Sequence, residues 1–272
     1  NPLINSRGEN VSAVFGFTNT ILNLLDQEKP DYFAVVFDTS EPTFRHELYE
    51  DYKAQRAKMP DDMVEQLPRL HEVLEKLNLP NVSLDGYEAD DIIGTLAKLA
   101  EEQDVETVIV SGDKDMMQLV TNKTLILNPK RSGQEPEWVG PKAVEDKIGL
   151  PPKKIIDYLA LMGDTSDNIP GVQGIGPKTA QKLLAKYGSL QDILENPDKI
   201  AENRYRSLIE ENAENAKLSQ ELATIKIDVP IELHLGELKP GAIDRDAAFA
   251  FFQQMEFTTL SQRFAPEEEE IP

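Results

Sequence analysis

Eight acidic side chains lie where predicted strands and helices begin or end. They are Asp38, Glu88, Asp90, Asp91, Asp113, Asp115, Asp164 and Asp167. Open α/β sheets bind ligands beyond the carboxyl ends of their strands, so we expect these side chains to converge. Converging carboxylates repel one another unless cations neutralise them. Because the sequence has no Cys and three His, hard cations such as Mg²⁺ or Mn²⁺ fit best. Taken singly, Glu88, Asp90 and Asp91 are better explained as helix-capping residues, and Asp38 as a turn residue.

A glycine turn forms a second candidate site. Gly174 and Gly176 allow close approach of the backbone, and Pro177 suits the first position of a helix. Such a helix start presents free N–H groups to an anion, and Lys178, Lys182 and Lys186 recur along one face of that helix. No acid occurs between Gly171 and Ser189. The pattern predicts contact with the DNA backbone, although a plain turn beside a solvated lysine face remains the alternative.

Basic and aromatic side chains are mixed between residues 45 and 58. Arg45, Lys53 and Arg56 lie there together with Tyr49 and Tyr52. Such mixtures bind unpaired strands by stacking and phosphate contact. Three acids within the same stretch also permit a solvated helical face.

The elements that must position these residues alternate along the first half of the chain. Apolar runs predict strands at 32–37, 82–84, 105–110 and 124–127, with helices at 14–25, 67–77, 92–100 and 116–120. This order predicts a largely parallel sheet with helices on both faces. After Gly140 we expect helices at 141–148, 152–162, 177–187, 189–194, 204–222 and 244–255. The division is therefore an α/β half, 1–140, and a helical half, 141–264, followed by an acidic linker, 265–272.

Composition adds broad limits. The 272 residues are 40% hydrophobic and carry a formal charge of −21. An even distribution of that charge would disfavour nucleic acid, but a sum does not locate the charges. No stretch approaches the roughly 18 apolar residues of a membrane span. We expect a cytoplasmic monomer without a membrane partner.

Six ordered motifs carry a resemblance to a known family. They are VVFD, FRHELYEDYKAQR, GYEADD, SGDKD, MGDTSDN and GVQGIGPKTAQKLL. Together they resemble the 5′-nuclease domain of bacterial DNA polymerase I, a member of the flap endonuclease family, over roughly residues 6–264. The resemblance implies a mixed α/β nuclease core, a helical arch at about 42–60 and a helix–hairpin–helix at about 169–187. It implies divalent-metal-dependent removal of 5′ flaps and 5′-terminal nucleotides from branched or nicked duplex DNA in replication and repair, with two Mg²⁺, or Mn²⁺, as cofactors.

The resemblance also implies roles for single residues. One metal ion would be served by Asp38, Glu88, Asp90 and Asp91, and the second ion or its outer shell by Asp113, Asp115, Asp164 and Asp167. In the arch, Arg45 and Arg56 would contact DNA, Tyr52 would stack on a base and Lys53 would contact the scissile phosphate, with Arg56 assisting. Gly174, Gly176, Lys178 and Lys182 would hold the duplex backbone, with K⁺ at the hairpin.

One departure concerns the start of the chain. The family opens with a strand that ends in an Asp metal ligand, and this sequence begins downstream of that motif. We expect a central strand and one ligand to be absent, which would impair stability and cleavage by this chain alone. The acidic end would lead to further polymerase domains.

Three other functions remain open. A phosphomonoesterase with an Asp nucleophile is compatible with the Asp-x-Asp pattern at Asp113 and Asp115 but gives no role to the glycine turn. A module that binds branched DNA without chemistry fits a truncated chain. A Pin-type ribonuclease would be shorter and would lack the helix–hairpin–helix.

Overall fold

The computed structural model describes residues 2–129, 134–232 and 234–266. The chain forms two compact units, each with its own hydrophobic core. Unit 1 comprises Asn1–Phe37, Ala57–Ser83 and Glu232–Pro272, and unit 2 comprises Asp38–Arg56 and Leu84–Ile231. The predicted division at residue 140 stays a prediction. The predicted acidic linker lies outside the described residues from Glu267 onward.

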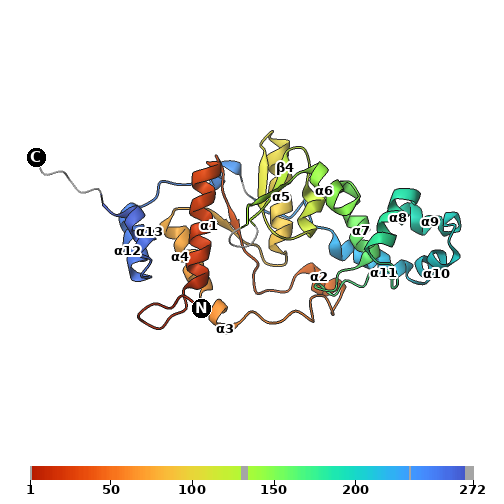
Figure 1. Cartoon of the computed structure of the whole chain (residues 1–272), viewed down its shortest axis with the longest axis horizontal. Coiled ribbons are helices and arrows are strands. Elements are labelled where there is room, and N and C mark those ends of the chain that lie inside the picture. Colours follow the sequence, from red (N-terminus) through yellow and green to blue (C-terminus); the bar gives the residue numbers. More distant parts are fainter. Residues whose placement is uncertain (1, 130–133, 233, 267–272) are drawn as a thin grey trace, which may run out of the picture. The chain divides into compact units, whose positions relative to one another are not determined.

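Unit 1 is mainly helical. Helix α1 packs on α4, α4 on α12, and α12 on α13, the last two drawn in blue in Figure 1. Its core is rich in phenylalanine. The ring of Phe252 contacts the rings of Phe251, Phe257 and Phe264. The elements are α1 (Ser12–Glu28), β1 (Val35–Val36), α3 (Asp61–Val64), α4 (Leu67–Lys76), β2 (Asn81–Val82), η4 (Leu235–Leu238), α12 (Arg245–Gln254) and α13 (Thr258–Phe264).

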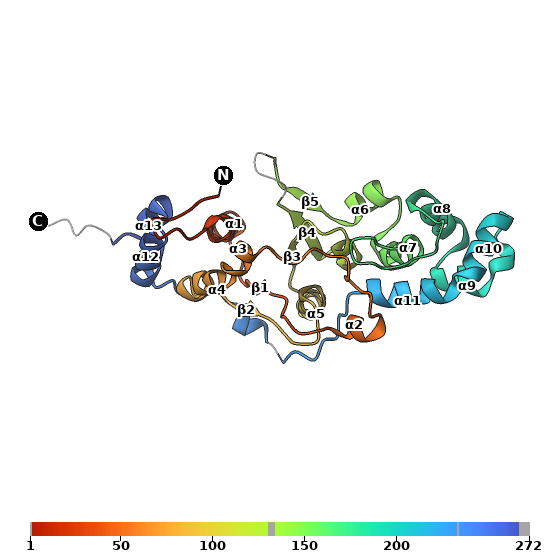
Figure 2. The same cartoon turned by 90° about the horizontal axis from the view of Figure 1, so that it is seen from below.

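Unit 2 holds the larger sheet and most helices. Its first elements are α2 (Phe44–Leu48), α5 (Ala89–Glu102), β3 (Thr107–Val110), η1 (Asp115–Leu119), β4 (Thr124–Asn128), β5 (Glu137–Val139) and α6 (Pro141–Ile148). The remaining elements are η2 (Pro152–Lys154), α7 (Ile155–Met162), α8 (Pro177–Tyr187), α9 (Leu190–Glu195), η3 (Pro197–Lys199), α10 (Asn203–Glu211) and α11 (Ala213–Ala223). The apolar helix α7 is central, since it packs on α8, α9 and α11 (Figure 2).

The sheets are smaller and more mixed than the predicted parallel sheet. Strands β1 and β2 pair in parallel over two residues each. Strands β3 and β4 are also parallel, whereas β4 and β5 are antiparallel. Among the described residues no strand pairs with the outer edge of β3, where Val108 and Val110 are exposed. The expectation of an absent central strand stays a prediction.

Several predicted helices differ in extent. The predicted helix at 204–222 is broken at Asn212 into α10 and α11, and the one at 152–162 divides into η2 and α7. The expected helical arch is represented in unit 2 by α2 alone, followed by turns to Arg56. Within the described ranges, no helix has the length and apolar character needed to cross a bilayer.

Two glycines make a close backbone contact after α7. Gly163 and Gly171 both have positive φ angles, +74° and +62°. A Cβ atom on Gly171 would lie 2.4 Å from the backbone nitrogen of Gly163. The loop between them closes through backbone hydrogen bonds between Asp164 and Ile169, and the Gly171 N–H donates to Ser219 Oγ at 2.8 Å. Only glycine fits this contact without moving the loop that carries two of the predicted carboxylates.

Substitution Gly171→Ala is expected to lower the free energy of unfolding by about 3 kcal/mol, because it combines left-handed strain with a backbone clash. Urea denaturation measures this change. Gly112→Ala is a matched control, since its Cβ would meet only Asn128 Oδ1 at an ordinary 3.7 Å and its φ is not positive. Equal effects of the two substitutions would contradict the close-contact explanation.

Candidate metal centre

A recess in unit 2 brings together carboxylates from three segments. The N-terminus of α5 supplies Glu88 and Asp90, η1 begins with Asp115, and the loop after α7 supplies Asp167. Glu88 is the N-cap residue of α5, so its position is fixed by the first turn of that helix. The lining residues are Arg45, Tyr52, Glu88, Asp90, Asp115, Asp167, Ile169, Leu222, Ala223 and Ile225. Four of the eight predicted carboxylates therefore meet.

Three further predicted carboxylates lie beside these four. Asp38 Oδ1 accepts a hydrogen bond from the Ala89 N–H at 2.7 Å, at the start of α5. Asp113 Oδ1 accepts from the Asp115 N–H at 2.9 Å. Asp164 is buried and faces Lys114, which follows Asp113 in the chain. These three acids therefore lie at the strand ends and helix starts that border the recess.

Two carboxyl groups of the recess are unusually hard to ionise. Burial, and after it the charge of Asp113, raises the pKa of Asp90 to about 7. The same two causes raise the pKa of Asp115 to about 7. The Oδ1 atom of Asp115 is buried without a hydrogen-bond partner in the structure. Buried charge without a partner is unfavourable, so this group calls for a cation.

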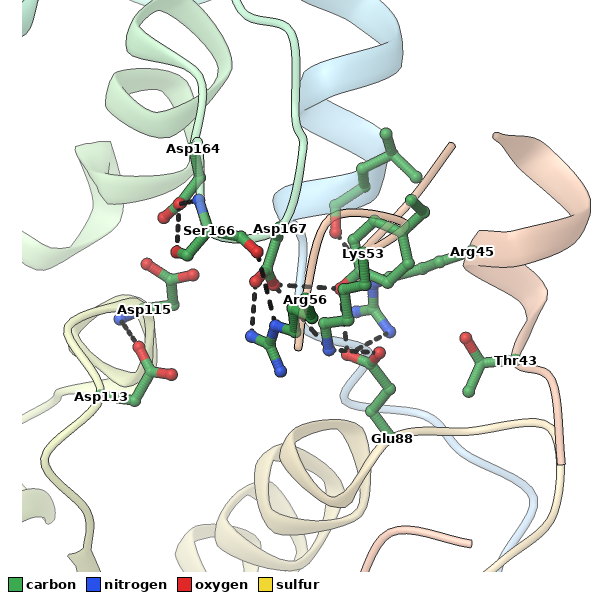
Figure 3. Close-up of polar contacts among 12 residues, drawn as sticks. Thr43, Arg45, Lys53, Arg56, Glu88, Asp113, Asp115, Asp164, Ser166 and Asp167 are labelled. Carbon is green, nitrogen blue, oxygen red and sulfur yellow. Dashed lines mark hydrogen bonds and ion pairs between the residues drawn. The ribbon is translucent and has the colours of Figure 1, made fainter. Parts of the chain in front are cut away.

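Basic side chains of the predicted arch reach into the same cluster. Lys53 Nζ lies 2.6 Å from Glu88 Oε1 and 3.8 Å from Asp167 Oδ2. Arg56 Nη2 lies 2.5 Å from Asp167 Oδ1. In Figure 3 the ends of both side chains lie between Asp167 and Glu88. The chain's own cations therefore neutralise part of the cluster.

Two residues that the sequence analysis did not select hold Asp164. Ser166 donates to Asp164 Oδ1 through its backbone N–H at 2.7 Å and its hydroxyl at 2.5 Å, as Figure 3 shows. Lys114 Nζ lies 3.0 Å from Asp164 Oδ2. Burial opposes ionisation of Asp164, but these hydrogen bonds outweigh it and lower its pKa. The available signal was a lysine between two aspartates in SGDKD.

The donor chemistry suits a divalent cation, although the distances are not those of a formed site. In the described part of the chain, no three His or carboxylate side chains are grouped closely enough to hold a metal ion. The unpartnered oxygen of Asp115 and the raised pKa values of Asp90 and Asp115 nevertheless mark a shortage of positive charge. The chemistry of these oxygen donors therefore fits a hard cation.

Three predicted site residues are placed differently from their expected roles. Tyr52 is 3% exposed, and its hydroxyl donates toward Glu88 and Asp167 at 3.2 and 3.3 Å. Its ring is therefore not open to a base in this structure, which disagrees with the expected stacking. Arg45 and Asp91 bind each other in the interior at 2.7 Å, away from solvent. The geometry therefore disagrees with a DNA contact by Arg45 and a metal contact by Asp91.

The predicted duplex-binding turn lies at the start of α8. Gly174 has a φ of +86°, Gly176 is the N-cap residue and Lys178 is exposed. Lys182 Nζ instead pairs with Glu202 Oε1 at 2.8 Å. The helix begins at Pro177, as the sequence indicated, and its first turn contains no acid.

Comparisons with known proteins place the chain in a family. A family model described as "5′-3′ exonuclease, N-terminal resolvase-like domain" matches residues 1–149, and one described as "5′-3′ exonuclease, C-terminal SAM fold" matches residues 150–246. The chain belongs to the 5′-3′ exonuclease family. DNA polymerase I of Bacillus subtilis is 41% identical over 268 residues, which cover 98% of this chain and 30% of that protein. The exonuclease chain thus spans about three tenths of that relative's length.

Solved structures share the fold of this exonuclease chain. A T5 5′-exonuclease with bound divalent metal ions (zinc) matches with a TM-score of 0.68 and 21% identity, covering 93% of this chain and 90% of that one. A bacteriophage T5 flap endonuclease in a pseudo-enzyme-product complex with DNA and metal ions matches with a TM-score of 0.65 and 20% identity, covering 93% and 89%. At these identities the likeness shows the fold: small mixed sheets with many helices, and a helical SAM-fold part.

The metal-free exonuclease chain is expected to lose stability as the pH rises from about 5 to 8. An unfolded Asp has a pKa near 3.9, so between about pH 4 and 7 folded Asp90 and Asp115 hold protons that the unfolded chain has released. Their stabilising contribution is complete below about pH 4 and is lost as the pH rises through 7. A net loss of about 1–2 kcal/mol lowers the thermal midpoint by roughly 3–6 °C.

Thermal unfolding in EDTA at pH 5.5 and 8.0 measures this effect, and Mg²⁺ is expected to reduce it. The double variant Asp90→Asn/Asp115→Asn is the control, because it removes both titrating groups and should flatten the dependence. A midpoint in EDTA that rises from pH 5.5 to 8.0 would contradict the assignment.

Proposed function

We propose that the chain is a structure-specific 5′ nuclease that hydrolyses phosphodiester bonds of 5′ flaps and 5′ ends in DNA. The observation that carries the proposal is the recess of Glu88, Asp90, Asp115 and Asp167, where a buried carboxylate oxygen has no partner. The exonuclease family supplies the reaction class. We further propose that the chain works as a monomeric part of a DNA polymerase I in replication and repair. A phosphomonoesterase or a Pin-type ribonuclease is disfavoured, because both family models that match the chain describe a 5′-3′ exonuclease.

Two Mg²⁺ ions are the proposed cofactors, and Mn²⁺ can substitute chemically. Asp38, Glu88 and Asp90 would hold one, and Asp113, Asp115, Asp164 and Asp167 the second or its outer shell. When bound, such ions supply activation of a water for attack on phosphorus and charge neutralisation at the leaving oxygen. Lys53 and Arg56 are ion-paired with Glu88 and Asp167, and both basic side chains would be available to the substrate when those carboxylates hold metal.

The basic side chains of the arch then act on the substrate. Lys53 and Arg56 can place positive charge against the scissile phosphate, where negative charge grows in the transition state. The buried Tyr52 positions this segment, because its hydroxyl bonds to carboxylates of both α5 and the loop after α7. No covalent intermediate is needed.

The duplex is proposed to bind at the start of α8. Gly174 and Gly176 bring the backbone close to a phosphate, and Lys178 offers an exposed charge beside the free N–H groups of the helix. Lys182 would join after leaving Glu202. We place K⁺ at this turn as a further proposed ligand, as the family resemblance implies.

A 5′-labelled flap substrate tests the proposal with the full-length protein and Mg²⁺. We expect short 5′ products in Mg²⁺ and none in EDTA. Binding of the same flap in Ca²⁺ without cleavage in Mg²⁺ would instead support a module that only binds branched DNA. Absence of both binding and cleavage would overturn the proposal.

A further inference from the structure

A buried ion pair lies at the wall of the recess, with its main contacts directed away from the carboxylate cluster. Arg45 is 2% exposed and Asp91 is 0% exposed. Arg45 Nη1 and Nη2 donate to Asp91 Oδ2 and Oδ1 at 2.7 and 2.8 Å. This is the two-pronged geometry that makes arginine–carboxylate pairs strong and directional.

The remaining polar atoms of the pair are engaged mainly by the backbone. Arg45 Nε donates to the Leu222 carbonyl and Nη2 to the Thr224 carbonyl, both at 2.8 Å. The carboxylate of Asp91 also accepts from the backbone N–H groups of Glu88 at 3.1 Å and Lys226 at 2.8 Å. Each Asp91 oxygen thus accepts two hydrogen bonds. Its lone pairs are therefore occupied and are not offered to a cation. Four of the five donors of Arg45 are likewise filled, and Nη1 lies 3.5 Å from Glu88 Oε2.

The pair joins three segments that carry the proposed machinery. Arg45 lies on α2, just before the turns that hold Tyr52 and Lys53, and Asp91 lies in the first turn of α5 beside Asp90. The third segment is the end of α11 and the residues after it. Helix α5 packs closely against this segment, since a Cβ atom on Gly94 would lie only 2.8 Å from Ile225 Cγ2.

Neighbouring contacts join α2 and η1 to the segment after α11. The Arg45 guanidinium carbon lies 4.5 Å from the centroid of the Phe44 ring, and Lys226 Nζ lies 5.2 Å from the same centroid. Gln118 binds the Ala223 carbonyl and the Ile225 N–H, both at 2.9 Å. The pair is therefore embedded in a packed polar network, and both side chains are almost completely buried.

We propose that Arg45 and Asp91 are positioning residues that fix the arch segment against the first turn of α5. Asp91 ties the first turn of α5 to Arg45 and to the Lys226 N–H without binding metal, and Arg45 orients the segment that carries Lys53 without contacting DNA. This assignment rests on the proposed nuclease function and replaces the roles that the family resemblance implied for both residues.

The first experiment compares Asp91→Asn with wild type in two measurements. Calorimetric titration with Mn²⁺, without substrate, is expected to give a Kd within about threefold of wild type. Flap cleavage at saturating Mg²⁺ is expected to fall at least tenfold and not to recover with more metal. Asp115→Asn serves as the comparison for a metal ligand, and Asp104→Asn as the matched surface control, since Asp104 pairs with Lys123 at an exposed site.

A different result for the metal affinity of Asp91→Asn would contradict the positioning role. A Kd for Mn²⁺ raised tenfold or more, with cleavage restored by excess metal, would make Asp91 a ligand and overturn the proposal. This measurement decides even if the wild type does not cleave DNA, so it is separable from failure of the proposed function.

Arg45→Lys is the second variant and keeps the test possible if Asp91→Asn does not fold. It retains a positive charge beside the buried Asp91 carboxylate. One ammonium cannot reach Asp91 and both carbonyls together. We expect cleavage to fall about tenfold, flap binding in Ca²⁺ to stay within twofold, and hydrogen exchange at 43–56 to rise while α8 is unchanged. Wild-type cleavage and exchange in Arg45→Lys would instead indicate a simple phosphate contact, which lysine preserves, and would overturn the positioning role.

Discussion

Asp115→Asn is expected to lower Mg²⁺-dependent flap cleavage by about 10²-fold or more, while raising the thermal midpoint of the metal-free protein. Asparagine keeps the shape of the side chain but removes a charge that is buried with an unpartnered oxygen and close to Asp113 and Asp164. In the absence of cations, that charge opposes folding. With cations bound, the same charge is needed to hold them. Activity and stability should therefore change in opposite directions.

Two measurements on one protein check this prediction. Cleavage of a labelled flap gives the activity, and thermal unfolding in EDTA at pH 8 gives the stability. Asp104→Asn, a substitution of the same chemistry on an exposed pair, should change neither. If Asp115→Asn cleaves like wild type, or is less stable than wild type in EDTA, the carboxylates do not form the proposed centre.

Lys53→Met is expected to reduce cleavage by about 10²-fold and to strengthen Mg²⁺ binding severalfold. Lys53 Nζ lies 2.6 Å from Glu88 and so competes with a metal ion for this carboxylate. Methionine keeps most of the apolar stem and removes the charge. Cations would then bind more easily, but the charge that offsets the growing negative charge on the phosphate would be missing.

Calorimetric titration and single-turnover cleavage separate these two effects. Lys123→Met is the matched control, because Lys123 pairs with a carboxylate at an exposed position in the same unit. Weaker metal binding in Lys53→Met would mean that Lys53 supports the metal site and does not compete with it. Unchanged cleavage would remove Lys53 from the proposed mechanism.

The sequence located the acids at the ends of strands and helices, but it could not assign a role to each of them. Element ends brought Glu88, Asp90, Asp115 and Asp167 to one recess, because strand and helix ends can be located from apolar spacing. It could not separate Asp90 from Asp91, which are adjacent on α5 and point in different directions. Which of them faces the recess depends on the tertiary fold.

The dependence on the tertiary fold also explains why some predicted strands and helices differ in extent from those in the structure. The apolar run at 32–37 forms only a two-residue strand, because a strand also needs hydrogen-bonding partners that composition does not reveal. The helices α10 and α11 are separated at Asn212, inside a run that looked continuously helical. A basic residue in a basic stretch was expected at the surface, but Arg45 is buried by a partner 46 positions away.

The backbone contact between Gly163 and Gly171 connects the loop of the proposed metal centre to the turn that is proposed to bind the duplex. Gly163 immediately precedes Asp164, and Gly171 lies three residues before the turn that is proposed to hold the duplex. Because the two backbones are in close contact here, this contact would fix the distance between the proposed duplex-binding turn and the proposed metal centre.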